Sequence, residues 1–254
     1  MSFSTNAEFT RAGALSRVGN LLSTSDMECL GRSHVAIFGL GGVGSYAAMA
    51  LARSGVGRLT LVDGDTVAVS NCNRQLMAYE DTLGLPKAEA LARELRRMMP
   101  GLALETVPAF ADEAAIRAWP LDDYDYVLDA IDTVSCKIAL ALRAKELDVP
   151  FLAAMGAGNK LDPTRLKVAD LAKTSVCPLA RVMRRELAHR GLEHVKVVYS
   201  DEPPMTPRNP ELRGSGRPSP GSLVMVPAAM GLVMASTVIQ DLIRIEGGES
   251  CKYL

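Results

Sequence analysis

The stretch VAIFGLGGVGSYAAMALARSGVGRLTLVDGD, residues 35–65, decides the fold class. Gly39, Gly41 and Gly44 form a G-x-G-x-x-G pattern between an apolar strand and a helix, and Asp63 ends the next strand. The pattern is typical of doubly wound α/β proteins, in which glycine amides at a helix N-terminus receive a phosphate and the acidic residue binds a ribose. It does not by itself separate NAD from another adenosine nucleotide.

Strand and helix patterns alternate along the chain on both sides of this stretch. After an amphipathic segment at about 14–31, we expect strands at 34–39, 58–63, 103–107, 124–130 and 150–155, separated by helices at 42–55, 85–100, 112–119 and 135–147. Beyond Gly156, strands at 165–171 and 195–200 flank a helix at 178–191. The alternation predicts a Rossmann-like, doubly wound, mostly parallel α/β sheet with a carboxy-terminal β/α elaboration.

We predict one domain over residues 1–254. It would consist of an amino-terminal helical segment (1–33), a nucleotide-binding core (34–156) and a substrate-facing extension (157–254). The extension contains a proline- and glycine-rich run at 201–221, which is long enough to indicate a mobile loop.

Composition excludes several classes of protein. The 254 residues are 48% hydrophobic and 22% charged, as in an ordinary soluble domain. The five cysteines form no C-x-x-C pair, which argues against a zinc-ribbon site and favours the reducing cytoplasm. The net charge of −1 gives no overall attraction for nucleic acid, but residues 158–217 hold 12 Lys and Arg against 7 Asp and Glu. That excess permits a polyanionic partner on one face, although a solvated helix and loop explain it equally well.

One apolar segment raises the question of a membrane. Residues 218–240 carry no charge, and the continuously apolar part, 223–235, is 13 residues long and contains Pro227 and Gly231. A spanning helix needs about 20 apolar residues, so we predict a buried core helix and no membrane. The amino terminus has no apolar run that would serve as a signal peptide.

The polar run NCNRQ, which follows the second strand, favours a triphosphate over NAD. It supplies Asn71, Asn73, Arg74 and Gln75, and Lys87 opens the next predicted helix. A triphosphate needs cations in addition to glycine amides, and arginine suits fork-like phosphate contacts. A lysine in a first helical turn opposes the helix dipole, which a nearby polyanion would relieve; the alternative is a lysine that extends into solvent.

Acidic residues at two strand ends complete the predicted site. Asp63 suits a ribose hydroxyl, unless it is an ordinary surface residue, and Asp132 suits Mg²⁺ that bridges phosphates or, alternatively, a helix cap. The chain has no G-x-x-x-x-G-K-[ST] motif, and its three histidines lie outside these motifs. Adenylation of a carboxylate, which relies on positioning and charge, is therefore the most economical chemistry.

At the motifs GLGGVGS, LTLVDGDTV, SNCNRQ, GLPKAE and LDAIDT, within residues 37–133, the sequence resembles ThiF/MoeB-like adenylyltransferases related to ubiquitin-activating enzymes. The resemblance adds Ser70 to the expected ATP contacts, and it suggests Arg17 as an arginine that reaches the nucleotide of a homodimer partner. Arg11 is the competing choice for that role. The expected ATP contacts are Gly41, Gly42, Asp63, Ser70, Asn71, Arg74, Gln75, Lys87 and Asp132, and the expected catalytic residues are Arg17, Arg74, Lys87 and Asp132.

Within that family, GAGNKLDPTRLKVADLAKTSVCPLARVMRREL and GSLVMVPAAMGLVMAS resemble the tRNA threonylcarbamoyladenosine dehydratases. This likeness implies ATP-dependent activation of the substrate carboxylate, ring closure and a tRNA partner. Cys177 stands where an aspartate is expected, and it is either a nucleophile or a small buried or capping residue. The same-fold alternative adenylates a ubiquitin-like or sulfur-carrier protein. Two functions of a different class stay open at this point: an NAD-dependent oxidoreductase and a non-catalytic nucleotide-binding protein.

If tRNA docks on the basic region, six arginines are the candidates for phosphate contact. They are Arg181, Arg184 and Arg185 on the predicted helix and Arg208, Arg213 and Arg217 on the loop.

Overall fold

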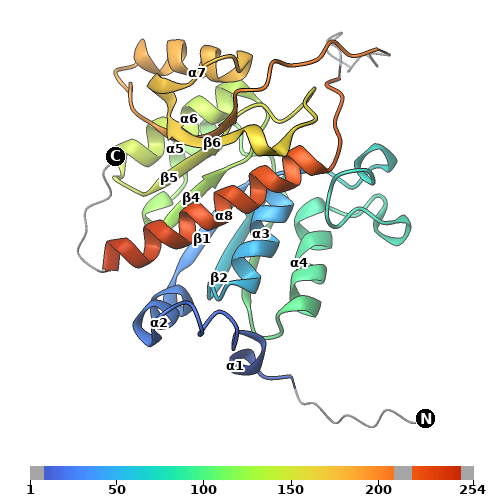
Figure 1. The fold of residues 1–254 in the computed structure, drawn as a ribbon, viewed down its shortest axis with the longest axis vertical. Helices are drawn as coiled ribbons and strands as arrows, with labels where there is room; N and C mark the ends of the chain where they lie inside the picture. Colours follow the sequence, from blue (N-terminus) through green and yellow to red (C-terminus); the bar gives the residue numbers. More distant parts are fainter. Residues whose placement is uncertain (1–8, 209–218, 247–254) are drawn as a thin grey trace.

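The structure is a computed structural model that describes residues 9–208 and 219–246 (Figure 1). Its centre is a seven-stranded sheet in the order β3-β2-β1-β4-β5-β7-β6. All neighbouring strands run parallel except β6 and β7, which are antiparallel. The strands are β1 (His34–Phe38), β2 (Arg58–Val62), β3 (Ala103–Val107), β4 (Tyr126–Asp129), β5 (Phe151–Ala154), β6 (Leu166–Asp170) and β7 (Lys196–Ser200).

Helices cover both faces of the sheet, as a doubly wound fold requires. One face carries α2 (Thr24–Arg32), α3 (Gly44–Arg53), α4 (Lys87–Met98) and the long α8 (Met225–Glu246). The other face carries α5 (Glu113–Ala118), α6 (Val134–Glu146) and α7 (Pro178–Ala188). The predicted Rossmann-like architecture with a carboxy-terminal β/α elaboration is confirmed.

The order of the strands fixes where a ligand binds. β1 pairs with β2 on one side and with β4 on the other, so the chain reverses its winding direction beside β1. Crevices at such switch points lie beyond the carboxyl ends of the strands. The glycine turn follows β1, Asp63 follows β2, and Asp132 comes three residues after the end of β4. All three therefore lie at one edge of the sheet.

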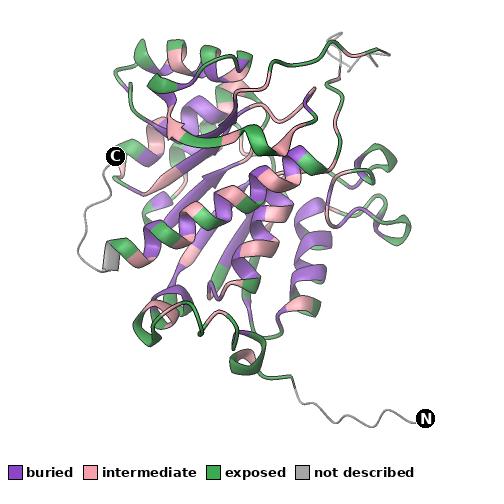
Figure 2. Cartoon of the chain, viewed as in Figure 1, coloured by how far each residue is buried: buried purple, intermediate pink, exposed green. Residues whose placement is uncertain are grey.

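The apolar carboxy-terminal segment is a core helix. α8 is long and apolar enough to cross a membrane, but 56% of the apolar window at Met225–Arg244 is buried inside the protein. It packs on α3 so closely that a Cβ at Gly231 would clash with the Val43 carbonyl oxygen. Figure 2 shows buried residues recurring along α8 between exposed and intermediate ones. The prediction of a buried helix is confirmed.

The amino-terminal segment, expected to be amphipathic at about 14–31 and helical within 1–33, contains two separate helices. It forms the short α1 (Arg11–Ala14), a series of turns, and then α2. Ser23 starts α2 with a capping box, because its hydroxyl accepts from the Asp26 N–H and the Asp26 carboxylate accepts from the Ser23 N–H. This cap ends the turns and begins a new helix, which the apolar periodicity alone did not reveal.

The predicted loop at 201–221 lies only partly within the described residues. Residues 201–208 and 219–221 contain no helix or strand, and 209–218 lie outside the described part of the chain.

Candidate functional site

The glycine turn brings β1 against the segment that follows β4. Gly39 has φ +86°, and a Cβ there would lie 2.7 Å from the Ala130 backbone. A Cβ at Gly44 would clash with the Gly39 carbonyl oxygen. Only glycine fits either position, so the two outer glycines of the motif set the shape of the turn. Gly41 and Gly42 are half-buried; Gly42 packs beneath Arg74 and Pro227, and Gly41 lies near Gln75.

Asp63 holds this turn to the end of β2. Its Oδ2 accepts from the Leu40 N–H at 2.7 Å, and its Oδ1 accepts from the Asp65 N–H at 2.8 Å. The carboxylate is half-buried, and each of its oxygens retains capacity for a second hydrogen bond. Asp63 is therefore a structural anchor of the turn and an acceptor available to a ribose hydroxyl.

Lys87 does not extend into solvent. Its side chain is 8% exposed, and Nζ lies 2.7 Å from Oδ2 of Asp65. Its backbone N–H donates to the Asp65 carbonyl, which fixes the first residue of α4 beside the β2 turn. Asp65 therefore supplies the negative charge that a lysine at a helix N-terminus requires. The solvent-exposed alternative is wrong because this carboxylate, two residues beyond Asp63, holds the ammonium inside.

Arg74 lies over the glycine turn. A Cβ at Gly42 would be 3.2 Å from the Arg74 carbonyl oxygen and 3.3 Å from its Cγ. The Arg74 guanidinium donates to the Ser70 carbonyl at 2.8 Å and to Oδ1 of Asn73 at 2.9 Å. Ser70 thus orients the Arg74 guanidinium through its backbone carbonyl, and Ser70 itself is exposed.

Gln75 and Asn71 are buried on the inner side of the same loop. The Asn71 Oδ1 accepts from the Ala68 N–H at 3.0 Å, and this bond closes the loop. Oδ1 of Asn71 therefore serves the loop itself. Among the described residues, Oε1 of Gln75 is the buried side-chain atom that has no hydrogen-bond partner. The Gln75 Nε2 lies 3.8 Å from the Cβ position of Gly41, so this unsatisfied carboxamide borders the glycine turn.

Asp132 is an exposed carboxylate at the end of the β4 segment. It is not the N-cap residue of α6, which is Thr133, and the Thr133 side chain makes no cap hydrogen bond. The neighbouring Asp129 forms a fully buried ion pair with Lys137, with 2.8 Å between Oδ2 and Nζ. Burial raises the pKa of the Asp129 carboxyl, and Lys137 opposes that shift. Asp129 is thus committed to the core, and Asp132 is the carboxylate of this segment that faces outward.

The two candidate amino-terminal arginines lie at the opposite end of α3 from the glycine turn. The Arg11 guanidinium donates to the Gly55 carbonyl at 2.7 Å, just beyond the carboxyl end of α3. Arg11 is therefore used within its own chain. Arg17 is exposed in the turns that follow α1, at the amino ends of the strands. The structure does not bring it to the nucleotide edge of its own chain.

Asn159 joins both described ends of the proline-rich loop to the site. Its carbonyl accepts from the Met205 N–H at 2.7 Å, and its Oδ1 accepts from the Gly221 N–H at 2.6 Å. The next carbonyl, Ser222, accepts from Nδ2 of Asn73 at 2.9 Å. The base of the loop therefore lies beside Arg74. Sequence reasoning missed Asn159, whose φ of +61° is typical of asparagine in turns.

Cys177 is buried, with 2% of its surface exposed, in the cluster between α6, α7 and the sheet. It is the N-cap residue of α7, but its side chain makes no cap hydrogen bond. The capping role is therefore wrong, and burial of a small residue describes the position. Lys160, which is also buried, donates to the Ser200 and Glu202 carbonyls, and burial lowers its pKa.

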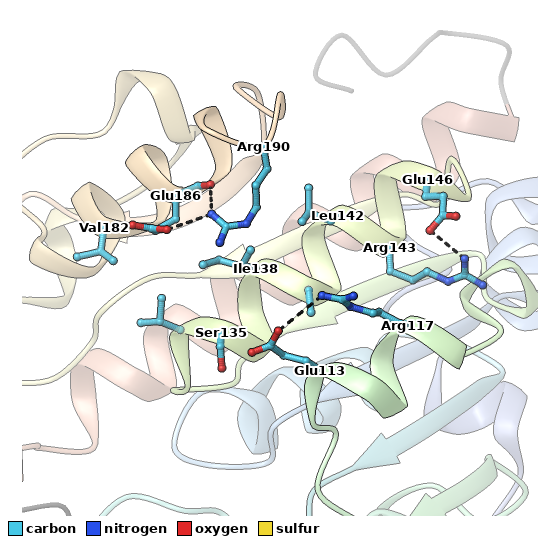
Figure 3. Close-up of a pocket in the computed structure, with 12 residues that line it drawn as sticks. Glu113, Arg117, Ser135, Ile138, Leu142, Arg143, Glu146, Val182, Glu186 and Arg190 are labelled. Carbon is cyan, nitrogen blue, oxygen red and sulfur yellow. Dashed lines mark hydrogen bonds and ion pairs between the residues drawn. The ribbon is translucent and has the colours of Figure 1, made fainter.

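A pocket of about 650 Å³ lies on the other face of the sheet, between α5, α6 and α7 (Figure 3). Its lining contains three arginines, and each forms an ion pair with a glutamate three or four residues away in the sequence. The pairs are Arg117 with Glu113, Arg143 with Glu146, and Arg190 with Glu186. The paired charges cancel, so this pocket does not offer the excess of cations that a triphosphate needs. The glycine-turn edge remains the candidate nucleotide site.

The basic region places its cations differently from the prediction. Arg181 and Arg185 are exposed on α7, but the Arg184 guanidinium turns inward and donates to the Thr174 carbonyl at 2.8 Å and to Leu171. Including Arg184 in a docking surface was therefore wrong, because it holds the turn before α7. Arg208 is exposed, whereas Arg213 and Arg217 lie outside the described residues.

Comparisons with known proteins show which family and fold the chain shares. The family model described as the ThiF family matches residues 15–253. The tRNA threonylcarbamoyladenosine dehydratase of Bacillus subtilis is 39% identical over 228 residues, covering 86% of this chain and 90% of the relative. The structure of Escherichia coli tRNA N6-threonylcarbamoyladenosine dehydratase in complex with ATP is 32% identical, with a TM-score of 0.85, and covers 94% of this chain and 97% of that one. The Escherichia coli molybdopterin-synthase adenylyltransferase is 40% identical over 125 residues, which is 49% of this chain and 50% of the relative.

The structure thus brings most of the predicted nucleotide residues to one edge. Gly41, Gly42, Arg74 and Gln75 meet at the turn, while Asp63 is linked through Asp65 to Lys87. Sequence reasoning missed Asp65. Its signal was the D-G-D triplet, in which a second carboxylate follows Asp63 at a spacing of two.

Proposed function

Because the chain belongs to the ThiF family, we propose that it is an ATP-dependent tRNA threonylcarbamoyladenosine dehydratase. The observation that carries this proposal is the end-to-end match, in sequence and in fold, to dehydratases of that name, one of which is described with ATP bound. The match to a molybdopterin-synthase adenylyltransferase extends over only half of the chain.

The nucleotide would bind along the glycine turn. Gly41 and Gly42 let the backbone approach the phosphates at the N-terminus of α3, and Arg74, which lies over Gly42, adds a guanidinium. Lys87 would face the phosphates from the opposite side, beside Asp65. Asp63 would accept from the ribose hydroxyls. The buried, unsatisfied carboxamide of Gln75 fits a site in which a bound molecule completes the hydrogen bonding.

In the proposed reaction, a carboxylate oxygen of the threonylcarbamoyl group attacks the α-phosphorus and pyrophosphate leaves. The carbamoyl group of the same side chain then attacks the activated carbonyl and closes a ring; AMP leaves, and the carbamoyl proton passes to solvent. The nucleoside loses the elements of one water. Both steps create or move negative charge on phosphate, so Arg74 and Lys87 stabilise them without a protein base.

Mg²⁺ fits this site as an ion that arrives with the nucleotide. The described residues contain no group of three or more His, Cys, Asp or Glu side chains that would hold a metal by itself. Magnesium typically uses one or two carboxylates together with phosphate oxygens. Asp132 is exposed, follows Ala130 and Ile131, which pack against Gly39, and would be that carboxylate. When bound, the ion supplies charge that favours departure of pyrophosphate.

We further propose that the enzyme is a cytoplasmic homodimer whose subunits complete each other's sites. Arg17 is exposed in the turns that follow α1, and Leu15 of these turns packs against Gly55, at the far end of α3 from the glycine turn. An arginine so placed can reach a nucleotide only in a second copy of the chain. Arg11 is a weaker candidate because it already caps the carboxyl end of α3.

The same-fold alternative, activation of a ubiquitin-like or sulfur-carrier protein through a thioester, is less well supported. A thioester needs an accessible thiol, and the thiol of Cys177 is buried. Exposed Cys72, in the loop beside Arg74, keeps the alternative testable.

The decisive experiment is incubation of the protein with ATP, Mg²⁺ and tRNA that carries threonylcarbamoyladenosine, followed by mass analysis of the nucleosides. We expect a product lighter than the substrate by one water, with formation of AMP. Cys177→Ser and Cys72→Ser should both retain activity. Loss of activity together with a trapped acyl group on either thiol would favour the carrier-protein alternative.

A further inference from the structure

We propose that Phe110 is the platform on which the adenine base of the nucleotide stacks. The inference rests on the proposed function. It adds a contact for the adenine base, which the residues proposed for the phosphates and the ribose do not supply. Phe110 lies in the loop between β3 and α5, and this residue is 71% exposed. Aromatic side chains gain much of their stabilisation from burial, so an exposed ring beside a ligand site indicates a surface that a ligand covers.

The position of the ring follows from its contact with Gly64. A Cβ at Gly64 would lie 2.5 Å from both the Phe110 backbone nitrogen and the Phe110 Cγ. Only glycine, which has no Cβ, fits at residue 64. The Phe110 ring therefore packs directly on the backbone of the turn that begins at Asp63. The Asp63 N–H also donates to the Val107 carbonyl at 3.2 Å, which ties the end of β3 to the same turn. The ring therefore lies beside the turn that carries the Asp63 carboxylate.

The chemistry of the ligand follows from this placement. A carboxylate that binds a ribose places the base one glycosidic bond away, on the side opposite the phosphates. The phosphates belong at Gly41 and Gly42, on the β1 side of Asp63, so the base points toward the loop after β3. A flat, exposed ring there suits the face of a purine, and stacking of a base on an aromatic ring is favourable for every base. Phe110 thus provides affinity for the base, without hydrogen bonds that would select adenine over guanine.

The test compares ligands that contain the base with one that lacks it. Phe110→Ala should weaken binding of ATP and AMP alike, by about ten-fold or more, because neither base can then stack on the ring. Binding of inorganic tripolyphosphate, which has no base, should remain within about two-fold of the wild type, a small effect on the scale of one base–aromatic stack. Leu21→Ala, which truncates another exposed apolar side chain in the turns between α1 and α2, is the matched control and should change neither.

A second variant gives a direct signal. Phe110→Trp, made in a Trp119→Phe background because Trp119 is the single natural tryptophan, should keep ATP affinity and show fluorescence quenching on addition of ATP or AMP. Tripolyphosphate should not quench. If the wild type binds no ATP, the proposed function fails. If the wild type binds ATP but Phe110→Ala binds it equally well and the introduced tryptophan shows no quenching, only the assignment of Phe110 is overturned.

Discussion

The Lys87 ammonium and the Asp65 carboxylate lie 2.7 Å apart at the start of α4, and the lysine is buried while the aspartate is exposed. Each residue depends on the other, because Lys87 stands at the positive end of the helix dipole and is removed from water. In the proposed site, a triphosphate would approach this carboxylate. If it does, the pair couples the stability of the empty protein to occupation of the site.

We expect Asp65→Asn to lower the melting temperature of the nucleotide-free protein, at a cost of about 1–2 kcal/mol because the carboxylate is partly screened by solvent. ATP should then raise the melting temperature of the variant by more than that of the wild type, since phosphate replaces the missing anion. Thermal denaturation with and without ATP measures both effects. The control is Asp81→Asn, which removes the partner of exposed Arg93. If ATP raises the melting temperature of the wild type, Asp65→Asn and Asp81→Asn by the same amount, Lys87 does not contact the phosphates of ATP.

Arg74 and Asp63 should affect different parts of the nucleotide. Arg74→Ala removes a charge-assisted phosphate contact, so ATP affinity should fall by roughly ten-fold or more while adenosine affinity changes little. Asp63→Ala should weaken adenosine and ATP alike. Because Asp63 also accepts from the Leu40 N–H, this variant should in addition melt at a lower temperature. Calorimetric titration of each variant with both ligands tests the assignment, and equal losses for Arg74→Ala would contradict it.

The Asp129–Lys137 pair predicts a stability effect that is independent of the nucleotide. Both side chains are fully buried, so Asp129→Leu leaves an unpaired ammonium in the core and should destabilise the protein by about 3–5 kcal/mol. The double variant Asp129→Leu with Lys137→Met removes both charges and should recover most of that loss. Denaturant unfolding of the two single variants and the double variant measures the coupling. Additive losses would show that the pair does not act as a unit.

The sequence predicted those parts of the fold that rest on local patterns. Val35 to Phe38 form a fully buried strand, and the glycine turn follows it, because apolar runs and glycines report backbone geometry directly. Contacts between distant segments were not predictable in this way. The Lys87–Asp65 pair, the inward turn of Arg184 and the clamp of Asn159 on Gly221 each depend on tertiary packing, which a single sequence does not encode as a local pattern.

Arg17 provides a test of the dimer. If it completes the partner's site, an inactive Arg17→Ala chain mixed with an inactive Lys87→Ala chain should regain part of the activity. One site of each heterodimer then combines an intact pocket with an intact arginine. Arg11→Ala, which removes the cap on Gly55, should melt at a lower temperature but retain activity per folded molecule. Heterodimers that form but remain inactive would exclude the exchange of Arg17 between subunits.

The last prediction concerns how tRNA is held. Lys173 and Arg181 are exposed beside and on α7, whereas Arg184 is committed to the turn before that helix. Reversing both exposed charges, Lys173→Glu with Arg181→Glu, should weaken tRNA binding and flatten its salt dependence, by roughly one unit of log–log slope for each phosphate that is no longer neutralised. ATP binding should be unchanged.

The matched control for that prediction is Arg96→Glu with Arg93→Glu on α4. Both arginines are exposed, so the net charge changes by the same amount on a different helix. Electrophoretic mobility or anisotropy measurements over a range of salt concentrations give the slopes. If both double variants flatten the slope equally, tRNA responds to net charge alone and α7 is not its docking surface. If only the α7 variant changes, the exposed cations of α7 contact the tRNA backbone, because overall charge is equal in the two proteins.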